Sequence, residues 1–165
     1  MVTNDILETM EPVKASSKQY MESPEVEAVA KAIIKNHNLD FGPADIVYFL
    51  VYPNISKKKA AQAIKCSDLV RFYSGNDFAV KVSGELWDML DSKTKELMIY
   101  HQLLHFSATF NSKNAEWKFS IRKPSYTNYY EIDDKHGNEF HKTIQATMSS
   151  LYDMEPKDED QISLF

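Results

Sequence analysis

The stretch His101-Gln102-Leu103-Leu104-His105 decides how this chain of 165 residues is interpreted. It lies in a predicted helix over residues 92–108, which begins after a capping pair, Asp91-Ser92. Four residues turn an α-helix by about 400°, so both imidazoles project from one face, one turn apart. Their ring nitrogens can then reach one tetrahedral zinc ion at about 2.1 Å. The spacing predicts a zinc site, whereas the alternative is a helix with one core and one boundary histidine.

A third zinc ligand is available downstream at His136, near the start of a predicted third helix. Asp133 and Asp134 stand beside it and are candidate hydrogen-bond partners for its ring N–H. His141 follows five residues later, so it points about 140° away from His136 and cannot easily share the same ion. We therefore predict His101, His105 and His136 as the metal ligands. His141 is interpreted as an exposed helical histidine, and it stays open as the alternative third ligand.

Gln102 stands where zinc hydrolases with the HExxH motif have a glutamate. That glutamate takes a proton from the metal-bound water and passes it to the leaving amine. Gln102 has nearly the same shape, but it can only orient a water and cannot accept its proton. Loss of a general base typically lowers the rate by about 10²- to 10⁴-fold. Three explanations remain open: a degenerate enzyme, a deliberate Glu→Gln substitution, or another base such as Glu139.

Outward from this stretch the sequence predicts an α+β fold with a small, mostly antiparallel sheet packed on two to three helices. A cap at Ser23-Pro24 starts a first helix that ends near residues 36–38. The remaining expectations are a buried strand over 44–52, a hairpin of 63–73 with 78–82, a helical turn over 85–90, a polar loop over 109–114, a strand over 116–122 and a third helix over 134–152.

The chain is interpreted as an N-terminal arm (1–22), one domain (23–154) and a tail (155–165). The net charge of −5 argues against DNA binding through bulk charge, so nucleic acid is not strongly indicated. The basic run Lys57-Lys58-Lys59 favours a solvated loop, with nucleic-acid contact as the minor alternative. The single cysteine, Cys66, excludes an internal disulfide. Without a predicted membrane span or signal peptide, we expect a cytoplasmic protein.

The last five residues, Gln161-Ile162-Ser163-Leu164-Phe165, resemble the bacterial sliding-clamp-binding motif, with the consensus Gln-Leu-Ser/Asp-Leu-Phe. In such a peptide the glutamine hydrogen-bonds at a groove rim, while the leucine and phenylalanine fill an apolar pocket. Pro156 and a charged spacer separate the pentapeptide from the domain, which makes burial in its own core a poor alternative. The resemblance implies the bacterial sliding clamp as a partner.

Over about residues 24–150 the chain resembles the phage metallopeptidases, a zincin-like group akin to the SprT and Spartan proteases. On that pattern His101, His105 and His136 match the zinc ligands, and Gln102 occupies the position of the catalytic glutamate. Gly137 follows His136 where an aspartate is usual. The resemblance also rests on the first helix, Asp45–Tyr52, Ala63–Val70, Asp77–Val80 with Leu86-Trp87, and Glu139-Phe140.

The resemblance implies a zincin-like fold, Zn²⁺ as cofactor, and a protein substrate. The function predicted first is a phage zinc metallopeptidase-like protein, recruited to the replication clamp in the bacterial host cytoplasm and inactive as it stands because of Gln102. The alternative is a non-enzymatic clamp binder that inhibits host DNA replication. A third interpretation is a small α+β domain whose histidines are unrelated.

Overall fold

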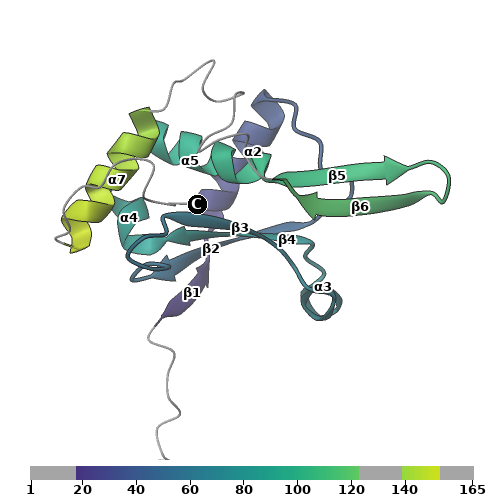
Figure 1. The fold of residues 1–165 in the computed structure, drawn as a ribbon, viewed down its shortest axis with the longest axis horizontal. Coiled ribbons are helices and arrows are strands. Elements are labelled where there is room, and N and C mark those ends of the chain that lie inside the picture. The colour runs from purple at the N-terminus through teal and green to yellow at the C-terminus, as the bar shows by residue number, and fades with distance from the viewer. Residues whose placement is uncertain (1–17, 123–138, 153–165) are drawn as a thin grey trace, which may run out of the picture.

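The computed structural model describes residues 18–122 and 139–152, which form an α+β fold (Figure 1). The predictions for His136 and for the pentapeptide 161–165 lie outside these residues. Within them no helix is long and apolar enough to cross a membrane. The elements are β1 (Gln19–Glu22), α2 (Pro24–Asn36), β2 (Ile46–Tyr52), β3 (Ala61–Lys65), α3 (Asp68–Ser74), β4 (Phe78–Ser83), α4 (Gly84–Met89), α5 (Ser92–Leu104), β5 (Phe106–Asn111), β6 (Glu116–Ile121) and α7 (Glu139–Tyr152).

The main sheet is mixed, with the strand order β1-β2-β4-β3. The pairing of β3 with β4 is antiparallel, as the sequence predicted. The pairing of β1 with β2 is also antiparallel, although the sequence indicated no strand over residues 19–22, which it placed in the N-terminal arm. The central pairing of β2 with β4 is parallel, with Ile46 opposite Phe78. This arises because β4 inserts between β2 and β3, a crossover that no local sequence signal reports.

Helix α2 begins as the sequence predicted. The Ser23 side chain accepts a hydrogen bond from the backbone N–H of Val26 at 3.2 Å, and Pro24 occupies the first turn. Val26, Ala30 and Ile33 form the buried face of α2, which packs against α5 and the sheet. The cap and the apolar spacing together fix where this helix starts and which side it buries.

The predicted hairpin of 63–73 with 78–82 is partly right. Strands β3 and β4 do pair antiparallel, but helix α3 lies in the connection between them. Ser67 caps the start of α3, and Gly75 ends it in the left-handed conformation with φ +74°. The Ser-Gly-Asn-Asp signal therefore marks the end of a helix instead of a tight hairpin turn.

The predicted helix over 92–108 is too long, and the predicted polar loop over 109–114 is right only from residue 112, because residues 109–111 belong to a strand. Helix α5 ends at Leu104, and Phe106–Asn111 form β5, paired antiparallel with β6. Phe106 is buried and its ring stacks on that of Phe78 at 4.3 Å, which draws this segment into strand geometry. The strand predicted over 116–122 is confirmed as β6. In Figure 1 this hairpin projects from the body of the molecule.

The core lies between the sheet and the helices, with α5 at its centre. Nearly every residue of α5 from Leu97 to Leu104 is buried, because it packs against α2, α7 and β3. Trp87 of α4 and Phe78 of β4 are fully buried in the same cluster. The helix that carries the histidine pair is thus the most enclosed helix among the described residues, so its side chains have few alternative rotamers.

Candidate metal centre

The first histidine of the pair, His101, is buried in the last turn of α5, with 1% of its surface exposed. Asp91 is the N-cap residue of α5, as predicted, but its side chain accepts a hydrogen bond from the Thr94 hydroxyl and none from a backbone N–H of the first turn. His105 follows one turn later as the helix C-cap and keeps helical dihedral angles, φ −69° and ψ −25°. The two ring centroids lie 5.1 Å apart, so the rings are neighbours on one face, as the spacing predicted.

A hydrogen bond to the hairpin fixes the ring of His105. Its Nδ1 lies 3.1 Å from the backbone oxygen of Arg122, just after β6. A carbonyl oxygen can only accept, so Nδ1 carries the proton and Nε2 keeps its lone pair. This is the tautomer that metal-ligating histidines commonly adopt. Residue 122 is held in place in turn, because its backbone N–H donates to the His105 oxygen at 2.7 Å.

The surroundings of His105 also favour the neutral imidazole. Burial is the largest effect and lowers the pKa of His105, and the charges of Arg122 and Lys59 lower it further. The hydrogen bond to the Arg122 carbonyl acts in the opposite direction but is the smaller influence. A neutral imidazole is the form that binds a metal ion.

Gln102, which the sequence predicts at the position of the general base, is fully buried beside His101. Its Nε2 lies 3.4 Å from Nδ1 of His101, while Oε1 has no hydrogen-bond partner among the described residues. A 180° rotation of the amide places Oε1 at that position, where it accepts a hydrogen bond from Nδ1–H and leaves the Nε2 lone pair of His101 available to a metal ion. In either orientation one end of the buried amide has no partner among the described residues, which is costly in a purely structural core.

His141 lies beside this pair, on the first turns of α7. Its ring centroid is 5.5 Å from that of His101, and its Nε2 is buried. The Phe140 ring packs against both histidines, at 4.4 Å from His141 and 6.4 Å from His101. The prediction of an exposed His141 is therefore wrong, because α7 packs this part of its surface against α5. The sequence offered no local signal for this, since only the tertiary packing of α7 brings the ring inward.

Two further predicted site residues are Glu139, which the structure describes, and His136, which it does not. Glu139, the alternative general base, begins α7 and is exposed. His136, the predicted third ligand, lies outside the described residues. Over 18–122 and 139–152, no three His, Cys, Asp or Glu side chains are close enough to hold one metal ion.

Comparison with known proteins identifies the family. The model of the family described as "Putative phage metallopeptidase" matches residues 18–152, so the chain belongs to that family. A metallopeptidase family implies a metal ion. No match was found among curated proteins or among solved structures.

The residues present fit such an ion. Two imidazoles lie one helical turn apart, and at His105 the hydrogen-bonded tautomer leaves a nitrogen available. Neutral imidazoles are common ligands of transition-metal ions.

Proposed function

We propose that this protein is a zinc-binding member of its family, with His101, His105 and His136 as ligands, in which Gln102 leaves peptide hydrolysis slow or absent. The observation that carries the proposal is the juxtaposition of His101 and His105, with centroids 5.1 Å apart and Gln102 buried beside them. A zinc ion supplies Lewis-acid activation of a water and of the substrate carbonyl. Gln102 orients a water by hydrogen bonding, but its amide cannot hold the proton that hydrolysis releases.

Zinc content tests the ligand set. Protein purified without chelator is expected to contain about one zinc per chain, and His101→Ala or His105→Ala is expected to lose it. His37→Ala is the matched control, because His37 stacks on Tyr100 elsewhere on the fold, at 4.2 Å, and its loss leaves zinc unchanged. Zinc near zero in the unsubstituted protein would contradict the proposal.

The same measurement identifies the third ligand. Loss of zinc in His136→Ala with retention in His141→Ala supports the proposed set. The reverse result would assign the role to His141, whose ring already lies 5.5 Å from that of His101. In that case His136 is replaced in the ligand set, while the rest of the proposal stands.

We also propose that the terminal pentapeptide, Gln161–Phe165, recruits the protein to the bacterial sliding clamp. Its support is the match of Gln161, Leu164 and Phe165 to the clamp-binding consensus. Ordering a short peptide offsets much of its contact energy, so micromolar affinity is expected. Clamp binding by the full chain should be lost in Leu164→Ala with Phe165→Ala and kept in Ser163→Ala, a position outside the two anchors. Unchanged binding without residues 161–165 would refute this proposal.

Gln102 favours one second candidate, a non-enzymatic clamp binder that blocks host DNA replication. In that case the metal site is retained for structure or lost. Proteolysis by a Gln102→Glu variant distinguishes the two candidates, because cleavage that appears only in the variant indicates an enzyme design inactivated at one residue. Continued absence of cleavage in a zinc-loaded, folded variant favours the binder.

A further inference from the structure

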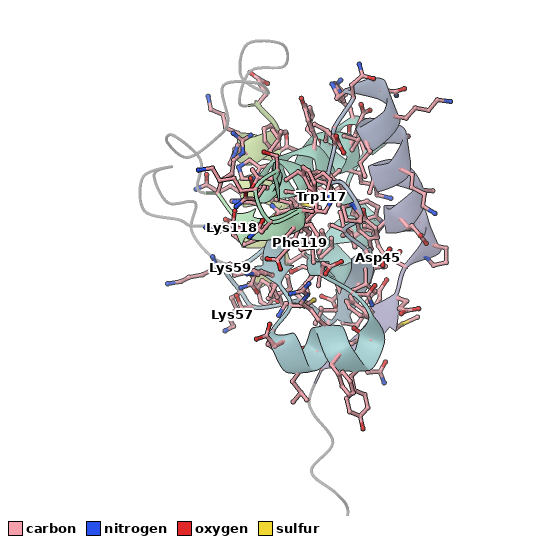
Figure 2. All side chains as sticks on the ribbon, turned by 90° about the vertical axis from the view of Figure 1, so that its right-hand side faces the viewer. Asp45, Lys57, Lys59, Trp117, Lys118 and Phe119 are labelled. Atoms are coloured by element: carbon pink, nitrogen blue, oxygen red, sulfur yellow. The ribbon has the colours of Figure 1, made fainter. Side chains whose placement is uncertain are left out.

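A groove of about 330 Å³ runs beside the β5–β6 hairpin, and none of its lining residues belongs to the metal centre. Its walls come from the end of β3, from α3 and from the hairpin. Figure 2 looks onto the hairpin from its outer end and shows Trp117, Lys118 and Phe119 grouped there, with α3 below them. The groove is therefore formed by parts of the chain that are distant in sequence, and its shape depends on the tertiary fold.

Trp117 provides a fixed aromatic surface at this groove. Its six-membered ring packs so closely on Gly42 that a Cβ there would lie 2.6 Å from a ring carbon. The Phe110 ring supports it at 5.4 Å, yet 39% of Trp117 remains exposed. Because Gly42 holds one part of the indole in place while another part is exposed, the side chain loses little rotamer freedom when a planar ligand stacks on it.

Positive charge surrounds this surface. Lys65 and Lys118 are exposed, and Arg71 is held by Asp77, with its Nε 3.0 Å from Oδ1, and by the Phe119 ring at 5.7 Å. Arg71 is neutralised by Asp77 and by Asp68, 3.9 Å away, so the positive charge that faces the groove comes from Lys65 and Lys118, against one lining carboxylate, Glu116. Since the whole chain has a net charge of −5, this is a local excess of the opposite sign.

We propose that this groove binds single-stranded nucleic acid, with a base stacked on Trp117 and phosphates contacted by Lys65 and Lys118. Aromatic platforms flanked by cations are the features that recognise unpaired strands. A duplex hides its base faces, and a neutral saccharide gives the two lysines no role. The proposal is independent of the metal centre and of the clamp peptide.

Binding of a labelled 12-nucleotide oligo(dT) to the full chain, followed by fluorescence anisotropy, tests the proposal. Trp117→Ala is expected to weaken affinity by about 5- to 150-fold, the value of one base stack. Each phosphate contact contributes about −0.7 to the slope of log K against log salt, so the two lysine contacts predict about −1.4. Lys118→Glu should reduce that slope, whereas Lys93→Glu should not, because Lys93 is exposed in the first turn of α5, at the end opposite the hairpin.

A second readout uses the unsubstituted protein and does not depend on how the variants fold. Trp87 is fully buried and Trp117 is exposed, and the chain has two tryptophans, so quenching of tryptophan emission by oligo(dT) reports Trp117. Saturable quenching over the same concentration range as the anisotropy change supports the site. Three results overturn it: no saturable binding, equal weakening by Lys93→Glu, or equally tight binding of a 12-base-pair duplex without quenching.

Discussion

Replacing Gln102 by glutamate tests whether its buried environment is built around a cation. The side chain has 0% of its surface exposed, and Oε1 has no hydrogen-bond partner among the described residues. Without a metal, a carboxyl group at this position must stay protonated at pH 7, about 2.7 pH units above its ordinary pKa. That costs about 3.7 kcal/mol. With zinc bound to the histidines, the ionised form is stabilised and most of this cost disappears.

The assay is thermal unfolding of Gln102→Glu with chelator and with zinc. For a chain of this size, 1 kcal/mol corresponds to about 2–4 °C, so the variant should melt about 7–15 °C below the unsubstituted protein in chelator. Zinc should restore most of that difference. In the double variant Gln102→Glu with His105→Ala, zinc should no longer raise the melting temperature. The control variant Gln62→Glu, on β3, should melt at the same temperature with and without zinc. Equal destabilisation of Gln102→Glu with and without zinc would refute the reasoning.

Three further predictions concern the fold. Gly84→Ala should lower the free energy of unfolding in urea by about 1–3 kcal/mol, because the added Cβ would lie 2.6 Å from the Tyr52 ring. Tyr52→Ala should relieve part of this loss in the double variant, and purely additive effects would contradict the prediction. Phe78→Ala should cost about 3–5 kcal/mol, because the fully buried ring contacts Phe106 and Phe119; a loss under 1 kcal/mol would show that these contacts are not formed. Burial raises the pKa of Tyr48, so above pH 10 the unfolded state releases a proton that the native state keeps, and stability falls by about 1.4 kcal/mol per pH unit. In Tyr48→Phe the free energy of unfolding should fall less steeply with pH above pH 10. The same steepness in the variant and in the unsubstituted protein would show that Tyr48 is in contact with water.

Local signals in the sequence determined the features that depend on neighbouring residues. The Ser23-Pro24 cap fixed the start of α2, and the four-residue spacing fixed the juxtaposition of His101 and His105. Both follow from helix geometry, which is the same in every protein. The alternation over Glu116–Ile121 likewise identified β6, because the period of a strand is local.

Only the tertiary structure decided the features that depend on distant contacts. The parallel pairing of β2 with β4 joins segments far apart in the chain, and residues 106–111 form a strand where Phe106 packs on the distant Phe78. The inward position of His141 requires α7 to dock on α5, and the groove at Trp117 requires Gly42 to lie beneath the indole. These contacts join segments through the folded core, and hydrophobic burial, which drives them, has no direction that a local pattern can encode.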